Sequence, residues 1–374
     1  MNRQLFAVAP GKLEWREVPV PEPGPDEVVV RSQYGAVKQG TEFSMVKGTA
    51  SLRGVWNEEL RLHERVSRCR AAGDRGTHSG AEAGADAGSE VGAPEFVPFP
   101  VGNMIAGEVG MAGADVEAFA PGDPVFGYAP CSEYVCIHRG RLRRLSGMGW
   151  KSALCLDPAR FSLGAVRDGT IRLGDTVAVF GLGAIGLISV RMAVLSGARL
   201  VFGIDPIETR RRIAVQMGAA EGLSPAECDI GRELKLRTEG TGVDVSVELS
   251  GSVGALQGCL RGTAFGGRVV CGAFPAPFPA GLDFGAEAHM NCLNIAFSRA
   301  GSDPNRDHPR WSSDRIENEC YRMIETGQLD GNAIIDRVVP YKDFKQEYEL
   351  VMADPARAVK LGVDFTKGGP QGEL

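Results

Sequence analysis

Apolar and polar positions follow two different patterns along the chain, and the change between them falls near residue 160. Before it, apolar positions alternate with polar ones between proline and glycine turns, for example at residues 13–18 and 27–32. This alternation predicts antiparallel β-strands. After it, strand-length apolar runs alternate with helix-length segments. That rhythm predicts a parallel sheet with helices between its strands.

The first pattern predicts more elements beyond these opening strands. They are strands at residues 101–110 and 131–138, a turn that leads into another strand within residues 119–128, and a linking helix at 151–168. Residues 49–94 are weakly patterned. Within them, residues 55–69 could form a helix, whereas residues 71–92 are almost all Gly, Ala, Ser, Asp and Glu. The latter segment buries too little apolar area to order itself, so we expect a mobile loop or disorder there.

The second pattern predicts strands at 177–180, 200–204, 243–249, 267–273 and 291–297, and helices at 184–196, 206–217 and 256–264. Two amphipathic helices are expected later, at 315–326 and 341–352, and an apolar run at 359–364 predicts a closing strand that returns to the first part. We therefore expect one domain made of residues 1–160 and 302–374, into which 49–94 is inserted, and a second domain made of residues 161–301.

A glycine-rich turn joins the first strand of the second part to its first helix. It consists of Gly181-Leu182-Gly183-Ala184-Ile185-Gly186, and an acid, Asp205, ends the next strand. The first glycine allows the tight turn, the second lets a pyrophosphate approach the backbone, and the third lets the helix pack on the sheet. The helix N-terminus offers free N–H groups and a partial positive charge. This context predicts a dinucleotide site, and a plain strand–helix–strand unit is the alternative.

Asp205 bears on which dinucleotide is bound. A carboxylate there can accept hydrogen bonds from both ribose hydroxyls and repels a 2′-phosphate, so NAD is favoured over NADP. Arg210 and Arg211 follow closely and weaken that preference. We expect Arg210 near the cofactor. Because strand ends of a parallel sheet line one crevice, further cofactor contacts are expected from Ser250, Gly251, Cys271, Gly272 and Ala273.

Composition narrows the class of protein. The 374 residues suit two domains, and 43% hydrophobic with 24% charged residues is typical of a soluble globular enzyme. A net charge of −6 without a dense basic stripe argues against nucleic-acid binding. No apolar stretch is long enough to span a membrane, and the start lacks a signal-peptide core. Nine scattered cysteines suggest reduced thiols in a cytoplasmic protein.

Taken together, the chain resembles the medium-chain dehydrogenase/reductase superfamily, which contains the alcohol and polyol dehydrogenases. The resemblance rests on LEWREVPVPEPGPDEVVVR, PGDPVFGYAPCSEYV, the GLGAIG turn and LDGNAIIDRVVPYKDFKQEYELV. It implies a GroES-like β domain next to a Rossmann domain, with the active site between them and a small-molecule substrate. It also implies a homodimer or homotetramer.

The chain departs from the superfamily where zinc-dependent members hold their metal. Glutamine replaces the ligand cysteine in Gln39-Gly40-Thr41-Glu42, and Gly102-Asn103-Met104 replaces a Gly-His-Glu string. The third ligand falls near Asp157 to Ala159. Zinc prefers thiolate, imidazole or carboxylate ligands, so we expect no catalytic zinc. Cys131 and Cys136 alone cannot form the four-cysteine structural site.

The zinc-less branch that includes bacteriochlorophyllide hydroxyethyl dehydrogenases is the most similar subgroup. It carries comparable Gly-Thr-Glu and Gly-Asn-Met strings, and Ser298-Arg299-Ala300-Gly301 with Pro309-Arg310-Trp311 also resembles it. Other relatives act on sugars, cyclitols and natural-product intermediates.

Without zinc, side chains must accept the proton and stabilise the developing oxyanion. We expect Lys38 to be the charged partner, although a solvated lysine is the alternative. The resemblance assigns Thr41 a proton-relay or orienting role, and Glu42 either acid/base chemistry or a structural one. Asn103 could donate a hydrogen bond to substrate or merely satisfy backbone groups. Tyr128 is a further candidate.

Three functions are compatible with these residues. The first is an NAD-dependent, zinc-independent oxidoreductase acting on a secondary alcohol or ketone of a sugar, cyclitol or natural-product intermediate. The second is a zinc-free NADPH-dependent enoyl or quinone reductase, against which Asp205 argues. The third is a dinucleotide-binding sensor without catalysis, which the loss of both zinc motifs would suit.

Overall fold

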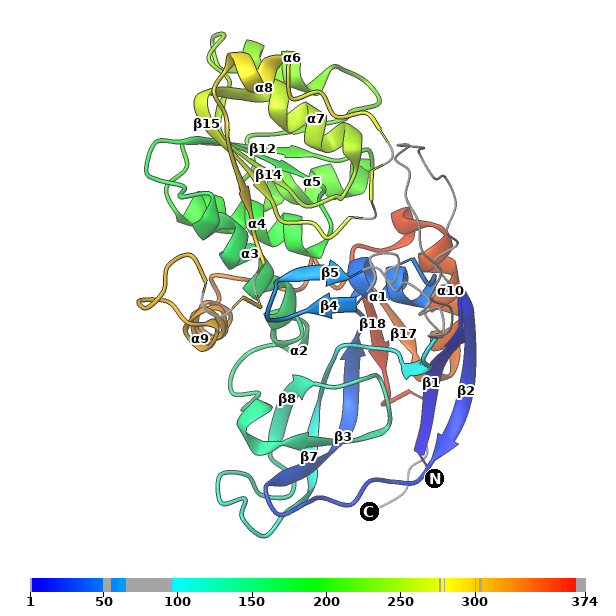
Figure 1. Cartoon of the computed structure of the whole chain (residues 1–374). Helices are drawn as coiled ribbons and strands as arrows, with labels where there is room; N and C mark the ends of the chain where they lie inside the picture. Colours follow the sequence, from blue (N-terminus) through cyan, green and yellow to red (C-terminus); the bar gives the residue numbers. More distant parts are fainter. Residues whose placement is uncertain are drawn as a thin grey trace, which may run out of the picture.

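The computed structural model describes residues 2–49, 55–64, 96–275, 277–278, 280–299, 301–302 and 305–367. A mainly antiparallel part and a parallel part lie at opposite ends of the molecule (Figure 1). The predicted α/β class, in which a β domain accompanies a Rossmann-type domain, is confirmed. In the described part of the chain, no helix is both long and apolar enough to cross a membrane.

The antiparallel part contains two main sheets. The smaller has the order β2 (Lys12–Val18), β1 (Asn2–Ala9), β6 (Phe99–Pro100). The larger has the order β10 (Leu142–Arg144), β8 (Pro124–Tyr128), β7 (Met104–Ala112), β3 (Glu27–Ala36), β18 (Leu361–Asp364), β17 (Arg337–Pro340), and β9 (Tyr134–His138) also pairs with β3. The closing strand β18 therefore returns to β3, antiparallel to it, as predicted from the sequence.

The parallel part is a single six-stranded sheet. Its order is β13 (Glu221–Leu223), β12 (Leu200–Ile204), β11 (Thr176–Phe180), β14 (Val243–Glu248), β15 (Thr263–Cys271), β16 (Asn294–Phe297). The connecting helices are α4 (Ala184–Leu195), α5 (Glu208–Gln216), α6 (Ile230–Arg237), α7 (Val253–Gly262) and α8 (Glu287–Met290). Every residue of β11 is buried, as expected for a central strand covered on both faces. The strand order reverses between β11 and β14, which makes the sheet doubly wound.

Two expectations from the pattern are wrong. Residues 55–64 form a hairpin, β4 (Val55–Asn57) and β5 (Leu62–Glu64), where a helix was expected. The Asn57 side chain accepts the Leu60 N–H, which favours a turn over a helix. Residues 65–69 and 71–92 lie outside the described part. The helix at 151–168 is split into α2 (Trp150–Ala153) and α3 (Leu156–Asp168), because Pro158 fits only the first turn of a helix.

The remaining helices belong to the junction and the closing segment. They are α1 (Gln39–Val46), which the pattern does not predict, α9 (Ser313–Glu325) and α10 (Phe344–Ala353), with short 3₁₀ turns η1 (Arg139–Arg141), η2 (Tyr341–Asp343) and η3 (Pro355–Arg357). In Figure 1, α10 and the strands β17 and β18 lie in the antiparallel part, beside β1 and β2.

The packing of α4 on the parallel sheet leads to a stability prediction. A Cβ added at Gly186 would lie 1.9 Å from the Gly181 carbonyl oxygen, whereas one added at Gly183 would meet no atom within 4 Å. We expect Gly186→Ala to lower the free energy of unfolding by about 1–3 kcal/mol or more, because the helix must shift. Gly183→Ala is the matched control and should stay close to wild type in thermal or urea unfolding. Equal melting temperatures for the two variants would contradict this account of the turn.

Candidate active site

Lys38 lies at the junction of the two parts, immediately before α1. Its Nζ is 3.0 Å from Asp157 Oδ1, and the same ammonium lies 4.1 Å above the Phe161 ring. Asp157 belongs to the first turn of α3 and its side chain is only 7% exposed. The predicted charged residue is therefore paired, and its partner is the first residue of the stretch where the superfamily's third metal ligand was expected. Asp157 was not itself predicted to act in catalysis.

Gln39, the first residue of α1, binds the start of this helix to the closing strand β18 and to the residues before it. Its Oε1 accepts the Leu361 N–H at 2.9 Å, and its Nε2 donates to the Ala358 carbonyl at 3.4 Å. The neighbouring Val37 N–H donates to the Leu361 carbonyl. A glutamine amide both donates and accepts, so it can bond to the backbone in both directions, which a cysteine thiol does poorly. Gln39 thus holds the adjacent Lys38 in place, and the amide oxygen of Gln39 already accepts a hydrogen bond from Leu361.

Lys360 is a buried residue of this region that the sequence reasoning missed. It is 3% exposed, and its Nζ donates to the Val37 carbonyl at 2.6 Å. Burial lowers the pKa of Lys360, although the nearby Cys155, Asp157 and Glu42 oppose that effect. In the sequence, Lys360 could have been noticed as the one cation within the apolar run at 359–364 that predicts the closing strand.

Glu42 and Thr41 lie one turn further along α1. Glu42 is buried, and its carboxylate accepts the Tyr348 hydroxyl at 2.7 Å and the Gly102 N–H at 2.9 Å. Burial raises the pKa of Glu42. These contacts join α1 to α10 and to the turn before Asn103. Thr41 is exposed, so it lies on the solvent side of the same helix.

Asn103 lies immediately before β7 and Tyr128 ends β8, opposite Met104, but the two side chains differ in their contacts. The Asn103 backbone bonds to Ala36 and Ala129, while its side-chain Nδ2 is buried and has no partner among the described residues. That amide can donate to a ligand. Tyr128 instead contacts Arg160 and Glu317, and burial raises the pKa of its hydroxyl. The structure thus places Tyr128 in a charged cluster with Arg160 and Glu317. The charge of Asp157, which pairs with Lys38, also contributes to the raised pKa of Tyr128.

The side chains at the three positions where the superfamily is expected to carry zinc ligands, Gln39, Asn103 and Asp157, do not fit a zinc ion. Gln39 is engaged with backbone groups, Asn103 offers an amide, and the carboxylate of Asp157 holds an ammonium. Tetrahedral zinc is bound by thiolate, imidazole or carboxylate. Within the described residues, no group of three or more His, Cys, Asp or Glu side chains could hold a metal ion.

The glycine turn has the geometry that a dinucleotide requires. Gly181 has a φ of +87°, and a Cβ there would lie 2.7 Å from the Ser250 nitrogen. Space is open beside Gly183, which begins α4 without a side-chain cap. Ala184 and Ile185 form the first turn of α4, where N–H groups have no helical partner. These residues fit a bound pyrophosphate.

Asp205 braces this turn from the end of β12. It is 4% exposed, and its two oxygens accept the N–H groups of Leu182 and Ile207, each at 2.8 Å. Carboxylate oxygens accept more than one hydrogen bond, so ribose hydroxyls can still bind here.

Glu248, which the sequence reasoning missed, organises the predicted crevice residues on the other side. Its carboxylate accepts from the backbone of Ser250 and Gly251, and its carbonyl accepts from Gly272 and Ala273. Burial raises the pKa of Glu248. Cys271 pairs with Glu248 across β14 and β15. The available signal was an acid at the end of a predicted parallel strand, where strand ends line the crevice.

Arg210 and Arg211 are both engaged by carbonyl groups. Arg210 Nη2 donates to Pro355 at 2.6 Å and to Ala358 at 3.3 Å, and its Nη1 lies 3.8 Å from Asp205 Oδ2. Arg211 donates to the Asp205 and Pro206 carbonyls. Arg210 therefore reaches from the parallel part to the antiparallel part.

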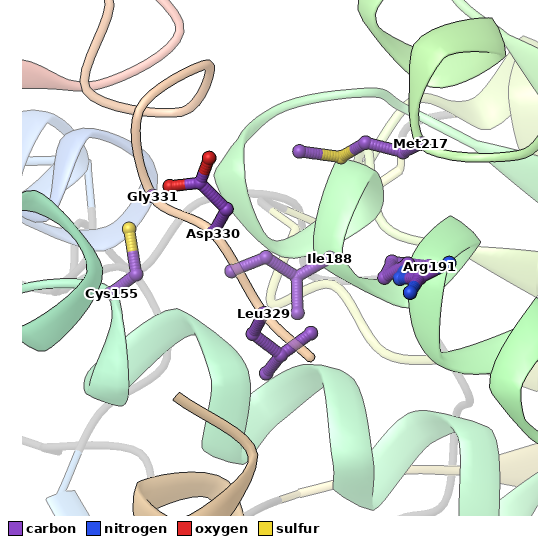
Figure 2. A pocket seen from close by; sticks show the side chains of 7 residues that line it. All are labelled: Cys155, Ile188, Arg191, Met217, Leu329, Asp330 and Gly331. Atoms are coloured by element: carbon purple, nitrogen blue, oxygen red, sulfur yellow. The ribbon is translucent and has the colours of Figure 1, made fainter. Parts of the chain in front are cut away.

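A small cavity lies apart from these two sets of residues. Figure 2 shows its lining, which consists of Cys155 just before α3, Ile188 and Arg191 of α4, Met217 just after α5, and Leu329, Asp330 and Gly331 after α9. Its volume of about 20 Å³ is enough for one water. It cannot admit a nicotinamide or a sugar.

Comparison with known proteins agrees with this geometry. The family profile described as zinc-binding dehydrogenase matches residues 184–306. D-guloside 3-dehydrogenase of Escherichia coli strain K12 is 39% identical over 350 residues, which cover 91% of this chain and 93% of that protein. An alcohol dehydrogenase of Cupriavidus necator is 27% identical, with coverage of 97% and 98%.

A solved structure shows the same fold. It is a zinc-binding dehydrogenase from Sinorhizobium meliloti bound to NADP, and it superposes with a TM-score of 0.71 at 20% identity, covering 97% of this chain and 99% of that one. With its glycine turn and its similarity to D-guloside 3-dehydrogenase, this chain belongs to the zinc-binding dehydrogenase family of the medium-chain dehydrogenase/reductase superfamily, and it is an oxidoreductase of the NAD(P)-dependent alcohol dehydrogenase type.

Proposed function

We propose that this chain is an NAD-dependent, zinc-independent oxidoreductase that interconverts a secondary alcohol and a ketone. The observation that carries the proposal is the Lys38–Asp157 ion pair at 3.0 Å. An ammonium occupies the carboxylate that would otherwise be free to bind a metal, so the cation that stabilises an alkoxide is provided by a side chain.

In this proposal the chemistry is divided among Lys38, Asp157, Asn103, Thr41 and Glu42. A bound nicotinamide accepts or returns the hydride. The Lys38 ammonium donates a hydrogen bond to the substrate oxygen, and during reduction it stabilises the negative charge on that oxygen and gives it a proton. During oxidation Lys38 first releases a proton to water, and the neutral amine then takes up the proton of the alcohol. Asp157 orients the ammonium. Asn103 donates from its unpaired Nδ2 to a second substrate hydroxyl. Thr41, on the solvent side of α1, exchanges the proton with water, while Glu42 holds the helix in place.

A sugar or related polyol is the substrate class that we propose. The relative with 39% identity is named for action on D-guloside at position 3, a secondary alcohol. A polyhydroxylated ring offers several donors and acceptors to a site with Lys38, Asn103 and Thr41. The zinc-less branch of bacteriochlorophyllide hydroxyethyl dehydrogenases stays the predicted subgroup. A cytoplasmic location also stays a prediction, and the cysteines in the described part of the chain form no disulfides.

Removing the ammonium tests the mechanism. We expect Lys38→Ala to lower kcat by about 10²–10⁴-fold, because the proton and charge partner is lost, while the NADH dissociation constant changes little. Turnover of D-gulosides and related secondary alcohols, followed by nicotinamide absorbance, should be insensitive to a chelator. Lys47→Ala, at the exposed C-terminal end of the same helix, is the matched control.

Stability must be separated from chemistry in this test. Lys38→Ala leaves Asp157 buried and unpaired, which costs about 3–5 kcal/mol. The pair Lys38→Met with Asp157→Asn removes both charges and should fold while staying inactive. Turnover that a chelator abolishes, or wild-type turnover in Lys38→Ala, would overturn the zinc-free mechanism.

Asp205 supports NAD over NADP, and the engagement of Arg210 and Arg211 with carbonyl groups limits how far these arginines weaken that preference. A 2′-phosphate would meet a buried carboxylate, and Arg210 and Arg211 already donate to carbonyl groups. We expect wild type to bind NADH at least about tenfold more tightly than NADPH, a difference of ~1.4 kcal/mol.

The variant Asp205→Ser should reduce that ratio by about tenfold or more, because it removes both the ribose acceptor and the repulsion. Fluorescence titration with NADH and NADPH measures the ratio. Glu208→Ser, an exposed acid at the start of α5, controls for general loss of negative charge. A wild-type preference for NADPH would instead favour the reductase alternative.

A homodimer is proposed across the free edge of the parallel sheet. The edge strand β16 exposes Phe297 (73%) and Ile295 (40%), and Phe265 and Met290 nearby are each 73% exposed. Exposed apolar edge strands favour pairing with another chain, and a second copy would cover the same residues on both sides.

Charge placed on this edge should dissociate the dimer. We expect Ile295→Glu with Phe297→Glu to sediment as a monomer where wild type sediments as a dimer, because the carboxylates of one copy would face those of the other across the edge. Leu173→Glu, at a site that is 89% exposed elsewhere, should leave the mass unchanged. An unchanged mass in the edge variant would place the interface elsewhere.

A further inference from the structure

Arg210 is the side chain through which the dinucleotide site touches the closing segment of the chain. It extends from α5 and is only 14% exposed. One end of its guanidinium lies 3.8 Å from Asp205, and the other donates to the carbonyls of Pro355 and Ala358. Because the arginine fork has fixed geometry, moving either end moves the other.

The Ala358 carbonyl is shared between the two parts of the molecule. It also accepts the Gln39 amide at 3.4 Å, and Gln39 holds Leu361 through its oxygen. Lys38 precedes Gln39 directly in the chain. On the opposite side, Asp205 accepts the Leu182 N–H of the glycine turn. Hydrogen bonds and one close charge contact thus connect the turn that meets the pyrophosphate with the residue next to Lys38.

We propose that Arg210 is a positioning residue that couples dinucleotide binding to the placement of Lys38, acting through Ala358 and Gln39. The inference rests on the proposed dinucleotide site and goes beyond it. When ribose hydroxyls donate hydrogen bonds to Asp205, the charge and geometry near Arg210 change. The Ala358 carbonyl, which accepts from both Arg210 and Gln39, transmits this change to Gln39. Coupling of this kind is reciprocal, so Gln39 influences NADH affinity although it belongs to the other part.

A neighbouring arginine provides a matched control. Arg211 is also on α5 and also contacts the residue 205 backbone, but its partners Asp205, Pro206 and Glu227 all belong to the parallel part. Arg211 therefore lacks the hydrogen bonds to Pro355 and Ala358 through which Arg210 reaches the antiparallel part.

The test is a double-mutant cycle on NADH binding, followed by protein fluorescence with the full-length chain. We expect Gln39→Ala to weaken NADH binding by about threefold or more, a size typical of coupled pairs. In the Arg210→Met background the same change should have almost no effect, whereas in the Arg211→Met background it should keep its full effect. Arg210→Lys, which can reach one carbonyl, should restore part of the coupling.

The outcomes separate this inference from the proposed function. Equal effects of Gln39→Ala in the wild-type and Arg210→Met backgrounds would overturn the coupling, as would no effect in wild type, while NADH binding itself stands. A folded wild type that binds neither NADH nor NADPH would instead refute the dinucleotide site. Melting temperatures identify any variant that fails to fold, and Arg210→Lys then replaces Arg210→Met in the cycle.

Discussion

The half-buried ion pair between Lys38 and Asp157 is the constraint on which the active-site region depends. Placing a carboxylate at 7% exposure is unfavourable unless a cation and hydrogen bonds compensate. The cation must therefore be held in place, and neither α1 nor α3 can shift independently of the other. Lys38 alone is a flexible side chain. Its position is defined because Val37 and Gln39, on either side of it, are bonded to the closing strand.

This dependence explains the residues that replace the superfamily's metal ligands. In a zinc site, metal–ligand bonds would fix the segment that follows β3. Here the amide of Gln39 and the buried ammonium of Lys360 perform that task by binding backbone groups. Glu42 adds a third attachment through Tyr348 and Gly102. The position where the superfamily is expected to carry its ligand cysteine thus lies in a segment that hydrogen bonds between side chains and backbone groups join to the closing strand and to the residue before it.

Local and long-range features differed in how far the sequence could predict them. The glycine turn and Asp205 are within 25 residues, and each residue type has a role that follows from backbone chemistry, so the motif was identified together with its strands and helices. The partners of Lys38 and Gln39 could not be found this way, because Asp157 and Leu361 are separated from them by more than a hundred residues. Pro158 could have predicted the break between α2 and α3, because proline is disfavoured in the interior of a helix. The apolar pattern instead predicted one continuous helix over residues 151–168. In the sequence, Glu248 and Lys360 could be noticed only as charged residues within predicted strands.

Two acids at the ends of the strands that flank β11 show how the predicted dinucleotide crevice keeps some backbone donors available. Asp205 and Glu248 are both buried and both accept backbone N–H groups from the loops around them. These loops would otherwise leave inward-facing donors unsatisfied, at a cost of about 1–3 kcal/mol each. Since the acids satisfy Leu182, Ile207, Ser250 and Gly251, the first-turn donors of α4 remain directed to the open side at Gly183. The open side at Gly183 therefore presents backbone N–H groups that suit an anionic ligand, while the two acids hold the surrounding loops in place.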